Sequence, residues 1–431
     1  MPDNDLTDHS KEIEYYFDRL WPICRSITGD GLRKSFEIIK EIIPLNLHEV
    51  SSGSTVYDWT VPDEWNINDA YIVTPDGKKI ADFKKNNLHV VNYSVPVDMQ
   101  CSFRELEPHL FYRKDIPDAV PYVTSYYKRE WGFCIDYNTW QTLPREGTYR
   151  VLIDSTLAPG SLTYGDLLVP GDSEDEIMFS SYLCHPSMAN NELSGPLTLA
   201  FLYKQLVKRK KRRYSLRFVI APETIGAICY LHRNSKRLTD NVRAGFIFTC
   251  CGDPGPITYK MTRSENSLAD KIVNHVLKHA GFGYNTIPFD PIGSDERQYS
   301  SPGFNLPVGV IMRTPFSEYP EYHTSHDNKQ VMDFEKMQQL IHVMAGVTDA
   351  FEINQRYKNQ IMYGEPFMGK RQLYEDLGNR KSHSENLKMR MRLLNYMDGK
   401  NDVIDICEKY DYDVNDVSNH VALLLEHGLI K

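Results

Sequence analysis

Short apolar runs and helix-like apolar spacing alternate through the middle of the chain. Residues 177–183 and 214–222 are apolar runs, and between them residues 193–206 place apolar side chains on one helical face. Apolar runs of this length between polar loops indicate buried strands. The helical spacing of the apolar residues between them indicates a helix. A strand–helix–strand order predicts parallel strands joined by a right-handed crossover.

The same alternation continues toward the carboxyl end. Further strands are expected at residues 244–251 and 306–312, and further helices at about 264–280 and 333–351. This repetition predicts an α/β fold with a sheet flanked by helices.

The amino-terminal third has two textures. Residues 8–43 show helical spacing that Pro44 ends, whereas residues 52–165 contain a predicted hairpin at 71–78 and a stretch rich in aromatics and prolines at 117–140. We expect a discontinuous α/β domain made of residues 1–51 and 166–365. Residues 52–165 would be an inserted β-rich domain that covers the mouth of a site and favours short substrates.

The last segment, 366–431, predicts three short helices at 389–397, 403–410 and 414–427, followed by a short strand at 428–431. This order resembles a winged-helix module. The presumed recognition helix, 414–427, contains no lysine or arginine. Because phosphate contacts come chiefly from such residues, we do not expect nucleic acid as a partner. Packing or dimerisation, and hence a homo-oligomer, is the expected role.

Candidate chemistry collects where the predicted strands end. His185 follows the strand at 177–183, Glu223 follows the next, and the loop after 306–312 holds Glu321 and His323. In parallel α/β sheets the loops at the carboxyl ends of strands converge on the bound ligand. Each residue also has a plainer interpretation: His185 and His323 as loop histidines, and Glu223 as a turn cap. The repetition at strand after strand favours a site.

Four segments resemble the motifs of the zinc-dependent aminopeptidase and carboxypeptidase-like exopeptidases. They are His185, residues 189–195 (Ala-Asn-Asn-Glu-Leu-Ser-Gly), residues 223–226 (Glu-Thr-Ile-Gly) and residues 323–327 (His-Thr-Ser-His-Asp). The chain is more closely similar to bacterial aminopeptidase-like proteins associated with polysaccharide biosynthesis. That similarity includes residues 24–29, 122–128, 293–298 and 319–324. It implies a mixed sheet of the zinc-exopeptidase type.

The resemblance also implies roles, with departures that change the metal site. Asn191 stands where the family has a bridging aspartate, and Thr224 stands where it has a second zinc-binding glutamate. We therefore expect one zinc ion rather than two. His185 and His323 would be ligands, and the third donor is left open between Asn191, Glu192 and an acidic residue near Asp253 or Asp295. Catalytic zinc commonly takes three protein ligands and a water.

Glu223 is the candidate general base, which would accept a proton from the attacking water. Arg297 could grip a substrate carboxylate, or it could pair with Asp295 at the surface. Tyr319 and Glu321, close to His323, could line a substrate pocket, with the carboxylate holding an amino group. The expected substrate-binding residues are Arg297, Asp295, Tyr319 and Glu321.

Charge and cysteine usage limit the remaining classes. The 431 residues carry a formal net charge of -9, which disfavours general attraction to nucleic acid. The eight cysteines form no Cys-x-x-Cys pair, and no apolar run reaches the ~20 residues that cross a bilayer. A reduced, cytoplasmic protein without membrane contact fits these features. Cys184, next to His185, is interpreted as a buried thiol rather than a nucleophile.

These features predict a zinc-dependent aminopeptidase-like hydrolase that cleaves an amide bond in a small peptide or an amino-acid or amino-sugar conjugate. The alternative is a ligand-binding protein on the same scaffold that has lost turnover, which Asn191 and Thr224 favour. A third hypothesis is a winged-helix regulator with a ligand-sensing domain.

Overall fold

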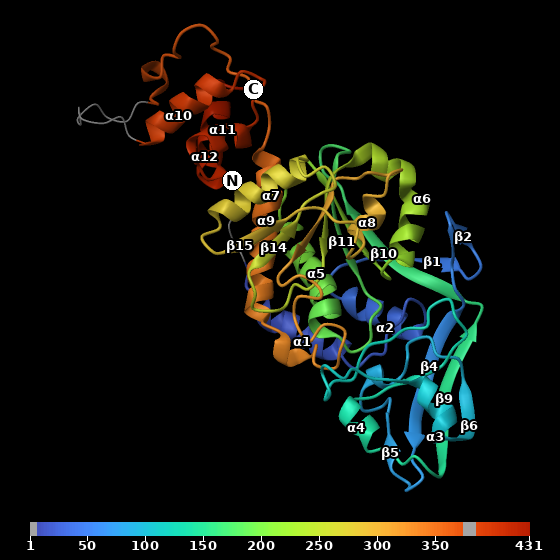
Figure 1. Ribbon diagram of the computed structural model, residues 1–431. Helices are drawn as coiled ribbons and strands as arrows, with labels where there is room; N and C mark the ends of the chain where they lie inside the picture. Colours follow the sequence, from blue (N-terminus) through green and yellow to red (C-terminus); the bar gives the residue numbers. More distant parts are fainter. Residues whose placement is uncertain (1–6, 374–384) are drawn as a thin grey trace.

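An eight-stranded mixed sheet is the centre of the computed structural model, which describes residues 7–373 and 385–431 (Figure 1). The strands, in spatial order, are β1 (Asn46–Ser51), β10 (Ser161–Val169), β12 (Ser215–Ala221), β11 (Glu176–Tyr182), β13 (Val242–Phe248), β16 (Val308–Met312), β14 (Ile257–Lys260) and β15 (Tyr284–Ile287). The four strands from β12 to β16 run parallel, whereas β1, β10 and β14 pair antiparallel with their inner neighbours. The parallel strands therefore end at one edge, as the sequence predicted.

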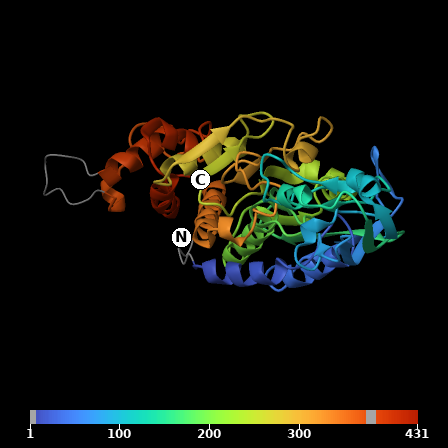
Figure 2. The same cartoon turned by 60° about the horizontal axis from the view of Figure 1, so that its bottom comes forward.

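Helices cover both faces of this sheet (Figure 2). One face carries α1 (Ser10–Leu20), α2 (Asp30–Ile39), α5 (Ser194–Leu206), α7 (Leu268–His279) and α9 (Phe334–Ile353); the other carries α6 (Ile225–Asn241) and α8 (Glu296–Tyr299). Ile177 and Phe179 of β11 join the first core, and Met178 joins the second. Burial on both faces explains why the central strands are continuous apolar runs.

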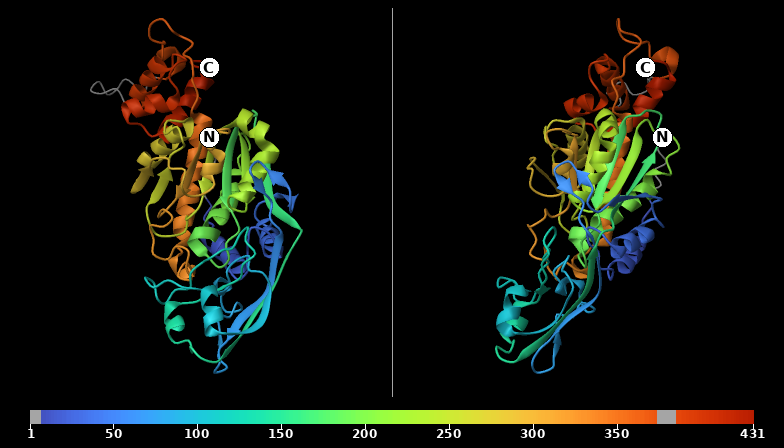
Figure 3. Two further views of the ribbon diagram at one scale, coloured as in Figure 1. Left: turned by 45° about the vertical axis from the view of Figure 1, so that its right-hand side comes forward. Right: turned by 90° about the vertical axis from the view of Figure 1, so that its right-hand side faces the viewer.

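The stretch predicted as an insertion forms a separate antiparallel sheet that projects from the α/β core (Figure 3). Its strand order is β5 (Lys79–Ile80), β4 (Glu64–Val73), β9 (Thr148–Ala158) and β6 (Val97–Ser102). Smaller elements of this region are β7 (Leu110–Phe111), β8 (Phe133–Cys134), α3 (Phe103–Leu106) and α4 (Tyr137–Gln141). The hairpin of β2 (Thr55–Val56) and β3 (Trp59–Thr60), also in the predicted insertion, lies instead beside α6 of the α/β domain (Figure 1). The chain leaves β9 and enters the large sheet directly as β10, which couples the two sheets.

The carboxyl-terminal module lies at the opposite end of the molecule from the projecting sheet (Figure 1). It contains α10 (Glu385–Tyr396), α11 (Val403–Tyr410) and α12 (Val414–Glu426), close to the helices predicted there. Asn359 and Ile430 form an antiparallel bridge in place of a longer strand. No helix in the described parts of the chain is both long and apolar enough to span a bilayer.

A buried histidine joins this module to the α/β domain. His275 of α7 is 2% exposed, its Nδ1 lies 2.5 Å from Glu408 of α11, and its Nε2 accepts the Val414 amide at 3.2 Å. The amide can donate only to an unprotonated nitrogen, so this arrangement requires the neutral imidazole. Burial lowers the pKa of His275, an effect that Glu408 partly opposes and nearby His279 reinforces.

We expect the contact between α7 and the carboxyl-terminal module to weaken as the pH falls below about 6.5, the ordinary histidine value. An undocked or unfolded His275 binds a proton more readily than the docked one, so protonation favours undocking. Hydrogen exchange of residues 403–426 at pH 7.5 and pH 5, corrected for intrinsic rates, measures this. His275→Gln, which cannot titrate, should lose the pH dependence; an unchanged dependence in that variant would contradict the assignment.

Candidate functional site

His185 is fixed from behind by a buried carboxylate. It lies just past β11, and its Nδ1 is 2.9 Å from Glu192 Oε2. The other Glu192 oxygen accepts the Cys184 amide and lies 3.7 Å from Arg25 Nε. Arg25 also donates to the His185 carbonyl at 3.1 Å. A carboxylate on one imidazole nitrogen sets the tautomer and ring orientation, so His185 presents Nε2 outward.

The charges around this pair favour the protonated imidazole when no ion is bound. Burial alone would lower the pKa of His185, and the Arg25 charge acts in the same direction. The hydrogen bond and the negative charge of Glu192 outweigh both, with a contribution from Glu223, and the pKa is raised. His185 Nε2 is therefore a site where positive charge is stabilised.

Glu223 faces the free nitrogen of His185. Its Oε2 lies 3.8 Å from His185 Nε2, and its side chain is 25% exposed. Its backbone amide donates to Cys184 Sγ at 3.3 Å, so Cys184 is used as a buried packing and hydrogen-bonding thiol. Burial raises the pKa of Glu223, although His185 and Arg297 oppose this rise. A carboxylate with a raised pKa beside an imidazole is suited to accept and return a proton.

The turn after Glu223 is strained and held in place. Thr224 has φ 64° and ψ -80°, an unfavourable conformation for a β-branched residue. Asp295 accepts its amide at 2.7 Å, and Arg297 donates to its hydroxyl at 2.9 Å. Asp295 and Arg297, both predicted to bind substrate, therefore support the Glu223 turn. Burial and the Glu223 charge raise the pKa of Asp295 well above its usual range.

His323 comes from the loop after β16 and lies next to His185. The two ring centroids are 5.6 Å apart. His323 stacks on Tyr322 with ring centroids 3.9 Å apart, and Tyr122 meets its edge at 5.2 Å. Burial, reinforced by the charge of His185, lowers the pKa of His323 to about 3. This imidazole is neutral at pH 7, with a nitrogen lone pair available to bind a metal.

The structure thus brings His185, Glu223 and His323 together from the loops that follow β11, β12 and β16. Among the described residues, the one group here whose three ligand atoms all lie within 4.8 Å of one another is Cys184, His185 and Glu192. His323 and Glu223 lie outside that group, so the three facing residues form an open arrangement rather than a closed metal cage.

The remaining candidate ligands are engaged elsewhere. The Asn191 carboxamide oxygen lies 3.3 Å from the Tyr182 hydroxyl, which also donates to the Asn191 carbonyl at 2.6 Å. Asp253 accepts from Asn190 Nδ2 at 2.9 Å and from the Thr314 hydroxyl at 2.6 Å. Glu192 and Asp295 are also bonded, so each of the four candidates for a third ligand is already engaged by protein groups.

Asp327 organises the loop that carries these residues. Asn190, Asn191 and Glu192 form a single π-helical turn, Ala189–Leu193, which leads directly into α5. Asp327 accepts the backbone amides of Asn190 at 2.7 Å and Asn191 at 2.9 Å. Burial raises its pKa to about 6 despite these bonds. Position 195, just after this turn, requires glycine, because a Cβ there would lie 2.4 Å from the Phe248 carbonyl oxygen.

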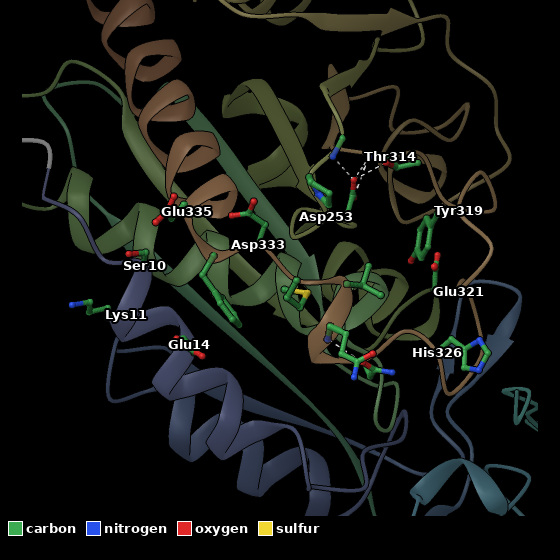
Figure 4. Close-up of a pocket in the computed structure, with 17 residues that line it drawn as sticks. Ser10, Lys11, Glu14, Asp253, Thr314, Tyr319, Glu321, His326, Asp333 and Glu335 are labelled. Atoms are coloured by element: carbon green, nitrogen blue, oxygen red, sulfur yellow. Dashed lines mark hydrogen bonds between the residues drawn. The ribbon is translucent and has the colours of Figure 1, made fainter. Parts of the chain in front are cut away.

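A cavity of about 1370 Å³ lies beside this loop (Figure 4). Tyr319 and Glu321 form one wall, and Ser10, Lys11 and Glu14 of α1 form the opposite wall. Its other charged and titratable lining residues are Asp253, His326, Asp333 and Glu335. The excess of carboxylates favours a cationic ligand. His185 and Glu223 do not line it, so the predicted pocket residues Tyr319 and Glu321 belong to a cavity adjacent to the site.

Three important residues were missed in the sequence. Arg25 and Tyr122 lie in segments that resemble the bacterial group, for which no individual role was predicted, and the backbone-organising role of Asp327 was not predicted either. Arg25 is fully buried, and Tyr122 touches both His185 and His323 with ring centroids 5.1 and 5.2 Å away. Their distance along the chain from His185 gave no local signal. Only the fold brings them to the site.

The fold defines the class of protein. A zinc aminopeptidase from Bacillus subtilis superposes with a TM-score of 0.58 at 12% identity, covering 81% of this chain and 95% of the other. An aminopeptidase from Aneurinibacillus sp. strain AM-1 gives 0.51 at 13% identity, covering 79% and 93%. The α/β domain therefore has the zinc-aminopeptidase fold, which confirms the predicted resemblance.

The chain belongs to the DUF4910 family, described as a domain of unknown function, whose pattern matches residues 15–354. A winged helix-turn-helix pattern matches residues 355–431. A Clostridium acetobutylicum protein, provisionally named a polysaccharide biosynthesis protein with aminopeptidase-like domain, is 46% identical over 97% of this chain and 96% of its own length. A crystal structure from C. acetobutylicum, provisionally named a peptidase, superposes with a TM-score of 0.91 at 43% identity, covering 98% and 96%.

We expect Glu192→Gln to lower the pKa of His185, because a neutral amide cannot offset the burial of the imidazolium. Histidine NMR titration of the metal-free protein measures the change. Glu321→Gln, a matched substitution in the adjacent cavity, should leave the His185 titration where it is. An unaltered His185 pKa in Glu192→Gln would show that Glu192 does not control this histidine.

Proposed function

We propose that this chain is a peptidase-type metallohydrolase that cleaves an amide bond in a small peptide or in an amino-acid or amino-sugar conjugate. The observation that carries the proposal is the orientation of His185: Glu192 holds Nδ1, and Nε2 points toward Glu223 with neutral His323 beside it. The zinc-aminopeptidase fold and the names of the Clostridium relatives support a peptidase-like activity in general.

The donor set fits one zinc ion better than two. His185 and His323 would hold it, since imidazole suits zinc and the second shell of His185 is already built. When bound, zinc polarises a carbonyl and lowers the pKa of a water ligand toward ~7. A second ion has no support, because Asn191 and Thr224 are neutral and the Thr224 hydroxyl accepts from Arg297.

The protein's own groups would then divide the work. Glu223 accepts a proton from the attacking water and returns it to the leaving amine, for which its raised pKa is suitable. Glu192 and Arg25 keep the His185 ring in one orientation. Arg297 and Asp295 keep the Glu223 turn in its strained conformation. Glu321 lines the acid-rich cavity, where it would attract a substrate amino group.

A binding protein without turnover is the second candidate. It is favoured by the tethered Asn191 side chain and by the open arrangement of His185, Glu223 and His323. Such a protein would bind zinc or an amine ligand and show no rate that depends on Glu223.

We further propose that the carboxyl-terminal module packs against the α/β domain rather than reading DNA. In winged-helix and related modules, the first residues of the recognition helix enter the major groove. Here Val414, the first residue of α12, is fully buried and donates its amide to His275. We therefore propose a small-molecule partner and no nucleic-acid partner. We also propose that the protein is cytoplasmic and can form a homo-oligomer.

We expect metal-depleted protein to bind one equivalent of zinc, weakly enough for a mild chelator to remove it, because two imidazoles are fewer ligands than the usual three. Isothermal titration with zinc gives the stoichiometry. His185→Ala and His323→Ala should each abolish binding, whereas His279→Ala, at a distant histidine pair, should not. Two equivalents, or binding that survives His185→Ala, would contradict the single site.

We expect Glu223→Gln to lower the hydrolysis rate by about 10²–10⁴-fold while zinc binding persists, because a general base contributes a factor of this size. Activity is measured on a panel of aminoacyl and acyl-amino amides. Glu321→Gln should alter KM more than kcat. Equal rates in wild type and Glu223→Gln would favour the binding protein, and loss of zinc in Glu223→Gln would make Glu223 a ligand instead.

A further inference from the structure

A second cavity, of about 460 Å³, lies between the projecting sheet region and His323. It is lined by Glu107, Leu110, Phe111, Tyr112, Arg113, Pro121, Tyr122, Val123 and His323. It therefore combines residues of the region predicted as an insertion with one of the two site histidines.

Backbone pairing fixes this cavity to the site. Tyr122 donates its amide to the His323 carbonyl at 2.9 Å, and Ser325 donates to the Val120 carbonyl at 2.8 Å. Pro121 and Thr324 form the antiparallel bridge between these bonds. His323 has φ 56°, so its loop is held in an unfavourable conformation by the segment that also builds the cavity.

The lining is mainly apolar and aromatic. Phe111 is 38% exposed, whereas Phe103 and Phe133 of the same region are buried. Of the two charged residues, Arg113 is paired with Asp115. An exposed aromatic ring in a concave apolar lining is typical of a small-ligand pocket, and the volume lies in the range of roughly 300–1,000 Å³ found for such pockets.

We propose that this cavity is a specificity pocket for an apolar, ring-bearing group of the substrate, such as the side chain of an aromatic aminoacyl unit. Tyr122 is the wall shared with the site, because its ring contacts both His185 and His323. A group seated in the pocket would therefore place its attached amide near these imidazoles. The volume of about 460 Å³ accommodates one side chain. This assignment rests on the proposed hydrolase function.

The test is binding of L-phenylalanine amide and L-alanine amide to zinc-loaded Glu223→Gln protein, in which turnover is suppressed. Isothermal titration should show the phenylalanine amide binding about tenfold or more tightly, because its ring is buried on binding. Phe111→Ala, which removes one wall, and Val123→Trp, which fills the cavity, should each remove most of this preference. Tyr57→Ala, at a 51% exposed aromatic outside the cavity, is the matched control and should keep it.

Equal affinity for the two amides would contradict the specificity-pocket assignment. So would a preference for the phenylalanine amide that neither Phe111→Ala nor Val123→Trp changes. Tighter binding of a methyl glycoside than of the phenylalanine amide would overturn its apolar character. If the amide preference depends on Phe111 but wild type hydrolyses no amide, the pocket stands and the hydrolase proposal fails. If wild type hydrolyses alanyl and phenylalanyl substrates equally, and Phe111→Ala does not change this, only the pocket fails.

Discussion

The hydrogen bond between Glu192 and His185 determines what the rest of the site can do. It places a carboxylate in a buried position where only strong partners make its charge tolerable, and Arg25, the Cys184 amide and His185 supply them. Because Nδ1 is occupied, Nε2 is the one His185 nitrogen left to face Glu223. The π-helical turn and Asp327 serve the same end, since they fix the backbone that carries Glu192.

The site is assembled from several segments: some supply its functional side chains, and others hold those side chains in position. The loops that follow three parallel strands supply His185, Glu223 and His323. The projecting region contributes Tyr122 and pairs its backbone with the His323 loop. It therefore helps position a site residue. Asp295 and Arg297 both bond to Thr224, so they act on Glu223 through the turn that they stabilise.

Much of this arrangement could be predicted from the sequence, because it follows from local pattern. The apolar runs before His185 and Glu223 became β11 and β12, and the three carboxyl-terminal helices lie close to their expected positions. The continuous helical region expected at 8–43 is instead two helices, since Pro22 and Gly29, whose φ is 97°, interrupt it. The seventeen-residue helix α6 was missed, because the polar half of its sequence hides its apolar face.

The roles of individual side chains were harder to predict, for physical reasons. Spacing along the chain shows which residues reach the sheet edge, but not which oxygen or nitrogen is already bonded there. Glu192 and Asp295 carry carboxylates that could bind a metal, yet both are hydrogen-bonded to neighbouring protein groups. Arg25 and Tyr122 come from distant segments. Their contacts depend on tertiary packing, which the spacing of apolar residues along the chain does not predict.

The central claim is that a fixed His185 and a neutral His323 share one divalent ion. Anomalous diffraction at the zinc edge, from crystals grown without chelator and soaked in zinc, tests it directly. The account predicts one peak, bonded to His185 Nε2 and to the His323 ring. The claim would be contradicted by no peak there or by two peaks. It would also be contradicted by an ion found only at the second donor group among the described residues, which is His275, His279 and Glu408.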